Sequence, residues 1–255
     1  MKRIALLFSI WLCSFLLLGE SFSGIYYPNP DVSYFFQNGI LKIDEFISKG
    51  KHDVEFFEYK YEETNKIPFI TIENEEGSKR YLILYSDEFL LMYDSPMSEP
   101  IQGGFFGRYI YDLFLSPVNY SVTNYLIDSK YDFSGENLGN LALFKPWVEG
   151  ESDVGIGQQI SLRFENGNDI HGFYFSNGFV SYNKPFLYEM NSRVKKIAVF
   201  DESNTFYREY EIVDSPKIQF FDVPIVDNIT IKILDVYHGS EWTDTCINFI
   251  LLESR

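Results

Sequence analysis

Apolar residues recur at every second position in short segments along most of this chain, and turn-forming residues separate the segments. In residues 228–236, for example, Ile229, Ile231 and Ile233 alternate with their neighbours. A period of two places successive side chains on opposite faces of a strand. The pattern therefore predicts an all-β protein.

Residues 24–107 contain the first group of such segments. Turns that include residues 74–79 and 86–88 join them as an antiparallel meander. The strands expected here are 53–61, 67–73, 80–85 and 89–93. Together they predict a small β-rich domain of unassigned role over 24–107.

Two other features of this first part are less regular. A short helix is predicted at 44–49, because Gly50 follows as a stop signal. The segment 94–107 is rich in Pro and Gly and ends the first domain. Residues 108–115 then connect to the second part as a strand or a short helix, which periodicity does not distinguish.

The second part, residues 116–255, reads as a longer series of strands. A hairpin-type turn with Asn166 and Gly167 at its centre joins the first two of them. The expected strands are 158–164, 170–176, 194–200, 205–213, 217–223, 228–236 and 246–253. Strands of this number and length predict an antiparallel jelly-roll β-sandwich.

The N-terminus has the pattern of a secretory signal peptide over residues 1–23. Lys2 and Arg3 precede an apolar run at 4–18, and cleavage is expected after Ser21 or Ser23. The run is shorter than the roughly 20 residues of a membrane-spanning helix. We therefore predict a secreted, periplasmic or envelope-associated protein without a membrane span after cleavage; an uncleaved anchor is the alternative.

Composition narrows the choice of partners. The formal net charge is −16, so the field of the protein repels polyanions, and nucleic acid is excluded as a partner.

Cleavage of the leader would leave Cys246 as the only cysteine, so that no intrachain disulfide could form. The fold then depends on its apolar core, for which 25 Phe and 19 Tyr supply ample surface.

Five short motifs follow one another in the second part: KPWVEG at 145–150, GIG at 155–157, Asn177-Gly178, NSRVKKI at 191–197 and YHGSEWTDTCI at 237–247. In this order they resemble the NADase-type glycan-binding domain, a discoidin-like branch of the galactose-binding-like superfamily. The resemblance covers residues 116–255. It implies a jelly-roll sandwich that binds carbohydrate through loops at one end.

A sugar site needs an aromatic face and a few fixed polar groups, and loops of a sandwich supply both. The candidate ligand-binding residues are Trp147, Glu149, Asn177, Phe179, Arg193, Trp242 and Asp244. Structural alternatives exist for several of them. Trp147 is more often a core plug than a stacking platform, Asn177 is typical of a turn, and Glu149 and Arg193 are typical of an ion pair with each other or with Asp244.

Signs of catalysis or of a cofactor are weak. No G-x-S-x-G nucleophile motif and no strand-to-helix G-x-G-x-x-G motif occur, and the three histidines lack zinc-ligand spacing. No catalytic residue and no cofactor are predicted, although calcium held by loop carbonyls and Asp153 or Asp244 is left open. Acidic pairs suited to a glycosidase include Glu149 and Asp244, but sequence does not give their separation.

The sequence thus predicts an exported, non-catalytic binding protein. Its partner is a glycan or another extended polar ligand, bound by the C-terminal sandwich. The alternative is a structural or protein-interaction module of the cell envelope with an envelope protein as partner, because the many Tyr and Phe residues could supply an apolar patch as well as a core.

Overall fold

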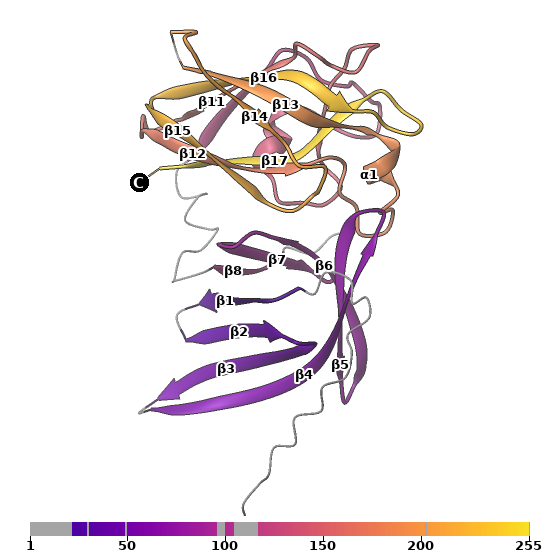
Figure 1. The fold of residues 1–255 in the computed structure, drawn as a ribbon, viewed down its shortest axis with the longest axis vertical. Helices are drawn as coiled ribbons and strands as arrows, with labels where there is room; N and C mark the ends of the chain where they lie inside the picture. Colours follow the sequence, from indigo (N-terminus) through magenta and orange to yellow (C-terminus); the bar gives the residue numbers. More distant parts are fainter. Residues whose placement is uncertain are drawn as a thin grey trace, which may run out of the picture.

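The computed structural model consists of two β-structures, one above the other in Figure 1. It describes residues 22–29, 31–48, 50–95, 100–104, 117–201 and 203–254. The N-terminal strands form the lower structure and the C-terminal strands the upper one. Within these ranges, the helices are one short α-helix, α1 (Leu187–Met190), and one 3-10 helix, η2 (Gly135–Gly139). The predicted all-β fold is confirmed.

The N-terminal strands form a closed barrel in chain order, so each strand pairs with the next one. They are β1 (Gly24–Asn29), β2 (Val32–Gln37), β3 (Ile40–Ser48), β4 (Lys51–Thr64), β5 (Ile67–Asn74), β6 (Gly77–Tyr85), β7 (Phe89–Tyr93) and β8 (Ile101–Gly104). The ring closes where Tyr27 of β1 pairs with Gly104 of β8. The predicted meander is therefore correct, and closure removes most of the free sheet edge.

The strands β6 and β7 are buried on both faces. Ile83, Leu90 and Met92 point into the barrel and pack in its aromatic core. The residues between them, such as Leu84 and Leu91, point outward yet are also buried. This explains why these segments read as continuous apolar runs rather than as alternating ones.

The helix predicted at 44–49 is wrong, because residues 40–48 form β3. This strand pairs with β2 and β4 over most of its length. Gly50 has a φ of 74° and makes the turn into β4 instead of capping a helix. Pairing with two neighbouring strands decides the conformation here, and local helix signals do not report such pairing.

The C-terminal strands form a curved sheet in the order β15-β12-β17-β13-β16-β11-β9. The strands are β9 (Val118–Val122), β10 (Trp147–Val148), β11 (Gln159–Phe164), β12 (Ile170–Asn177), β13 (Ser192–Asp201), β14 (Phe206–Glu211), β15 (Gln219–Val226), β16 (Asn228–Tyr237) and β17 (Thr245–Glu253). One core joins the inner faces of β11, β12, β13, β16 and β17. The Tyr120 hydroxyl of β9 donates to the Ile250 carbonyl of β17 at 2.9 Å, so the layers face each other as a jelly-roll sandwich.

The hairpin expected around Asn166 and Gly167 does not form, although the turn does. Gly167 has a φ of 72°, and its N–H donates to the Phe164 carbonyl at 3.2 Å. However, β11 pairs with β9 and β16, whereas β12 pairs with β15 and β17. The chain therefore crosses from one layer of the sandwich to the other at this turn, a choice that a local turn signal cannot reveal.

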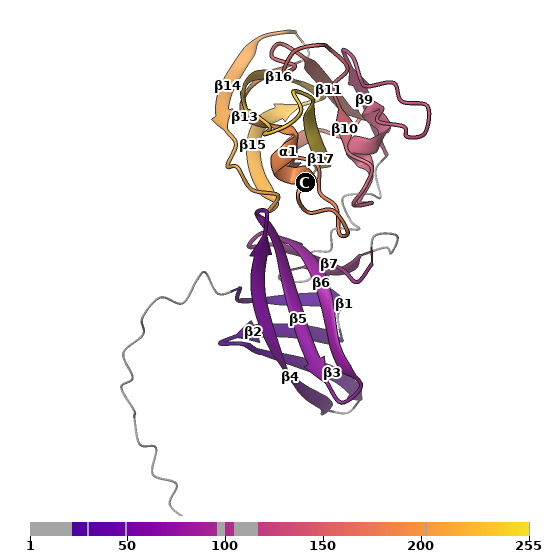
Figure 2. The same cartoon turned by 90° about the vertical axis from the view of Figure 1, so that its right-hand side faces the viewer.

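The barrel lies directly below the sandwich in Figures 1 and 2, and a second apolar cluster joins the two. Outward side chains of β5, β6 and β7 pack against the outer face of β12 and β17, including Tyr174, Phe249 and Leu251. Backbone contacts support the packing, since the Ile218 N–H donates to the Tyr85 carbonyl at 2.9 Å. The Tyr174 hydroxyl also donates to Glu88 of the barrel. The interface thus combines an apolar cluster with polar contacts between the two halves.

Residues 1–21 and 105–116, which carry most of the predicted signal peptide and the connecting segment, lie outside the described residues. Phe22 is described, and its ring packs between Phe36 and Tyr85 in the barrel core. Of the two expected cleavage positions, the one after Ser21 keeps this ring and the one after Ser23 removes it. No helix in the described ranges is long and apolar enough to cross a membrane.

We expect Leu91→Ala to destabilise the sandwich as well as the barrel. Leu91 is fully buried in the shared cluster, and such truncations cost about 2–5 kcal/mol. Trp147 and Trp242 both lie in the sandwich, so in a chain that lacks the predicted leader with Trp11, tryptophan fluorescence during urea unfolding reports that half. The midpoint should fall for Leu91→Ala and stay within error for Ile47→Ala, whose side chain is exposed. An unchanged midpoint for Leu91→Ala would mean that the halves unfold independently.

Candidate functional site

Three loops meet at the first residues of β17. Val148 of β10 pairs with Cys246, and the Glu149 N–H donates to the Thr245 carbonyl at 3.0 Å. The Gly178 N–H donates to the Cys246 carbonyl at 3.1 Å. On the other side, the Ser192 N–H donates to the Asp244 carbonyl at 3.0 Å. The backbone thus brings the segments that carry the candidate residues to one end of the sandwich.

Trp147 is part of the core. Its ring is fully buried in the main cluster of the sandwich, and the indole N–H donates to the Asn124 carbonyl at 3.1 Å. A buried indole with a satisfied N–H contributes packing and offers no stacking face to a ligand. The structure therefore agrees with the core alternative for this residue.

Glu149 is fully buried in the first loop. One carboxylate oxygen, Oε2, accepts the Glu151 N–H at 2.7 Å, and the other, Oε1, has no hydrogen-bond partner. Burial is the main cause that raises the pKa of this carboxyl to about 7; backbone hydrogen bonds lower the pKa, and the charges of Asp244 and Asp153 raise it by smaller amounts. The side chain is therefore half protonated near neutral pH.

The glycine-rich turn after Glu149 is shaped around this side chain. Gly155 has a φ of 69°, and a Cβ there would lie 2.7 Å from Cγ of Glu149. A Cβ at Gly150 would lie 2.4 Å from the Tyr125 carbonyl. Only glycine permits both approaches, so these residues are required for loop shape rather than for loop mobility.

Asn177 has a structural role. Its fully buried side chain donates to the Val194 carbonyl at 2.7 Å and accepts the Val194 N–H at 3.0 Å. Through these two bonds, the side-chain amide of Asn177 takes the place of a backbone peptide group and connects β12 to β13. Gly178, which follows, has a φ of 78° and makes the turn. No polar atom of Asn177 is directed to solvent.

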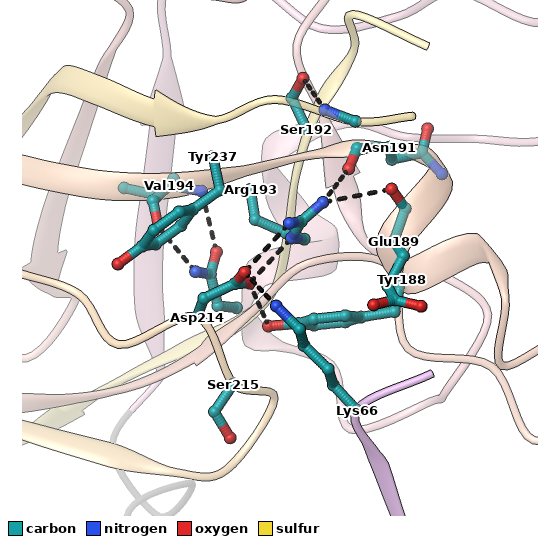
Figure 3. Close-up of polar contacts among 12 residues, drawn as sticks. Lys66, Tyr188, Glu189, Asn191, Ser192, Arg193, Val194, Asp214, Ser215 and Tyr237 are labelled. Atoms are coloured by element: carbon teal, nitrogen blue, oxygen red, sulfur yellow. Dashed lines mark hydrogen bonds and ion pairs between the residues drawn. The ribbon is translucent and has the colours of Figure 1, made fainter. Parts of the chain in front are cut away.

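Arg193 forms a buried ion pair, but its partner is Asp214 and not Glu149 or Asp244 (Figure 3). Nε and Nη2 contact the two Asp214 oxygens at 2.9 and 3.1 Å, which is a bidentate geometry. Nη1 donates to the Asn191 carbonyl at 2.7 Å. The predicted ion network exists with a different acid, which lies in a loop that the sequence did not single out.

Asp214 also joins the two halves of the molecule. Lys66, in the β4–β5 turn of the barrel, places its Nζ 2.5 Å from Asp214, and the Tyr188 hydroxyl donates to the same carboxylate at 3.3 Å (Figure 3). Burial raises the pKa of Asp214, but hydrogen bonds from Arg193 and Lys66 outweigh burial and hold it below the usual value. This carboxylate is therefore charged and fully committed to structure.

Trp242, Asp244 and Phe179 are more accessible. The Trp242 indole is 43% exposed, while its backbone N–H donates to the Met190 carbonyl at the end of α1 at 2.9 Å. Asp244 is half-buried, and burial raises its pKa. Phe179 packs against Val148 and Cys246. Of the candidate set, these three reach the surface of the loop end.

The sequence reading missed a fourth loop, residues 124–133, which lies beside the other three. The Leu126 N–H donates to the Val148 carbonyl at 2.9 Å. Tyr131 is 59% exposed, and its ring lies 6.0 Å from Phe133, which in turn lies 6.3 Å from Phe179. Residues 125–132 line an open cavity of about 410 Å³. An aromatic row and a cavity thus adjoin the predicted site.

A local signal for this loop is present in the sequence. Asp128 accepts the N–H groups of Lys130 and Tyr131 at 2.7 and 3.1 Å, which is an Asx turn. Tyrosines flank that turn at positions 125 and 131. A turn former between aromatic residues before the first motif would have identified the loop.

The described residues hold no group of three or more His, Cys, Asp or Glu side chains placed to bind a metal ion. Asp153 instead accepts the Gly155 N–H at 2.7 Å, which shapes the loop. The calcium alternative gains no support from these side chains.

The fold and the loop end define a discoidin-like β-sandwich that carries a barrel at its N-terminal side. The sequence model of the NAD glycohydrolase translocation F5/8 type C domain matches residues 111–253. This match covers more than half of the chain. The chain therefore belongs to that family, and the resemblance inferred from the five motifs is confirmed.

Several solved structures resemble the C-terminal half. A family 32 carbohydrate-binding module from Clostridium perfringens, solved with GalNAc-β-1,3-galactose, is 13% identical, with 54% of this chain and 95% of that chain covered and a TM-score of 0.38. The corresponding module of Streptococcus pneumoniae EndoD is 8% identical, with 55% and 97% covered and a TM-score of 0.41. No curated protein sequence matches the chain. The family assignment thus rests on the sequence model.

We expect Asp214→Asn to lower the free energy of unfolding by about 3–5 kcal/mol, because it leaves the Arg193 guanidinium buried without a counter-charge. Lys66→Met removes the partner that is partly exposed, and should cost less than about 1 kcal/mol. Urea unfolding of both variants at pH 7 measures the difference. Equal effects would show that the interdomain contact, rather than the buried pair, dominates.

The stability of the protein should depend on pH through Glu149. Its carboxyl binds a proton more tightly in the folded chain, so the stabilisation from protonation is complete below about pH 4.5 and is lost as pH rises through about 7. Glu149→Gln should remove this slope and be more stable than the wild type at pH 8 by about 3 kcal/mol. Urea midpoints from pH 5 to 8 measure it, with Glu151→Gln as the exposed control. A wild-type slope in Glu149→Gln would contradict the assignment.

Proposed function

We propose that the chain is an exported, non-catalytic protein that binds carbohydrate through the loops at the β17 end of its sandwich. Membership of a discoidin-like family supports a binding role for the C-terminal half. The observation that carries the proposal is the aromatic surface at this end, where Tyr131 and Trp242 are exposed on a backbone held by hydrogen bonds.

The chemistry of the surface suits a sugar. The apolar face of a pyranose stacks on an exposed aromatic ring, and its hydroxyls need fixed polar partners nearby. Tyr131 and Trp242 supply rings, and the half-buried Asp244 supplies a carboxylate at the same end of the sandwich. The cavity of about 410 Å³ at residues 125–132 is of the size of a small-ligand site.

The position of Glu149 supports a non-catalytic role. A glycosidase needs two carboxyl groups that both reach the scissile bond. Glu149 has no exposed surface and is held by the Glu151 N–H, so it cannot approach a sugar without displacement of its loop. Asp244 then lacks this partner. Export is proposed from the signal-peptide pattern of residues 1–23.

The test is a glycan array probed with the full chain, followed by titration of the best glycan. Tyr131→Ala and Trp242→Ala should each weaken binding about tenfold or more, since each removes a stacking face. Phe206→Ala is the matched control, because Phe206 is also exposed, at 53%, but lies away from the loop end. It is on β14 and packs on Phe200, which is at the far end of β13 from Ser192. The proposal fails if no glycan binds, or if the control variant loses binding as much as the other two.

A further inference from the structure

One strand of the barrel has an open edge. The strand β4 pairs with β5 only from Glu58 to Thr64, because β5 ends at Asn74. Its first half, residues 51–57, pairs with β3 on one side and with no described strand on the other. Figure 1 shows β3 and β4 running together to the lower edge of the barrel.

The strand register shows which backbone groups face the open side. Thr64 pairs with Ile67 across the two-residue turn, and the same alternation makes Glu62, Lys60 and Glu58 point toward β5. On the other side, the Tyr59 N–H donates to the Gly39 carbonyl at 2.8 Å. Continuing this alternation, Val54 and Phe56 direct their N–H and C=O groups to the open edge. Such groups are a template for one more strand.

The side chains at this edge are more apolar than exposed strand residues usually are. Phe56 is 66% exposed and Val54 is 39% exposed. Phe46 of the neighbouring strand β3 pairs with His52 of β4. It is 43% exposed, and its ring centroid lies 5.5 Å from that of His52. Exposed aromatic and branched side chains beside an unpaired strand edge are a feature of interaction sites.

The space beside the edge is acidic. A cleft of about 890 Å³ lies there, lined by residues 55–58 and 73–76. It contains five carboxylates, from Glu55, Glu58, Glu73, Glu75 and Glu76. Within the described part of the chain, only Glu73 among them has an ion pair, with Lys60 at 3.0 Å. An incoming strand would therefore meet negative charge next to the backbone groups that it pairs with.

We propose that the open edge of β4 is a docking site for an extended, basic segment of another protein, which adds a strand to the barrel. The backbone groups of Val54 and Phe56 would supply the hydrogen bonds. The carboxylates would select lysine or arginine at alternate positions of the segment. A second copy of this chain is disfavoured, because pairing of two such edges would bring the two acidic clefts together.

The test uses the full chain and a fluorescently labelled peptide in which lysine and valine alternate. Anisotropy should show saturable binding that weakens as salt is raised, and no binding of a peptide in which glutamate replaces lysine. Val54→Pro removes an N–H that points away from β3, so the barrel should keep its urea midpoint. Loss of edge hydrogen bonds should weaken binding about tenfold, whereas Val54→Thr, which keeps the N–H, should bind like the wild type.

A second variant tests the charge separately from the backbone. Replacement of Glu55, Glu58, Glu75 and Glu76 by glutamine keeps their shape and should weaken the lysine peptide about tenfold or more. Equal binding of the lysine and glutamate peptides would overturn the proposal, as would full binding by Val54→Pro. Dimerisation of the free chain in sedimentation, lost in Val54→Pro, would assign the edge to self-association and also overturn it.

Discussion

The outer face of β12 and β17 is apolar, and the barrel strands β5, β6 and β7 cover it. This burial makes β17 an internal strand with apolar contacts on both faces, although it lies in a sandwich whose layers usually have one wet side. Because β17 is held in this way, its first residues are a rigid support. Backbone hydrogen bonds to Thr245 and Cys246 therefore hold the loops in place on β17.

The ion pair of Arg193 and Asp214 has a related role at the edge of the same interface. The guanidinium lies among backbone carbonyls and a single carboxylate, and Lys66 of the barrel completes the group. A buried charge of this kind contributes little net stability but strongly disfavours arrangements in which its partner is missing. It therefore helps to specify how the β4–β5 turn sits on the sandwich. These buried contacts help to order the neighbouring loops, so that no accessible polar group is used for this purpose.

The two proposed binding surfaces lie on different halves and differ in chemistry. The loop end offers exposed rings and one half-buried carboxylate, which suits a sugar. The open edge of β4 offers backbone groups and unneutralised glutamates, which suits an extended basic segment. Part of the negative charge of the chain is therefore concentrated in the cleft beside this edge. A protein with both surfaces could link a glycan to a protein partner.

Alternation of apolar and polar residues predicted the all-β class and most strand positions, and the resemblance carried by five short motifs indicated the family, because both kinds of pattern are local properties of the chain. The sequence named Trp147 and Arg193 as candidate ligand contacts and left a core plug and an ion pair open as their alternatives; tertiary packing buries both side chains in these structural roles. Only the tertiary structure decided that residues 44–48 belong to a strand, that the turn at Gly167 crosses between layers, and that Asp214 is the partner of Arg193. Each of these depends on contacts between segments distant in sequence, and local pattern carries no information about which segments meet.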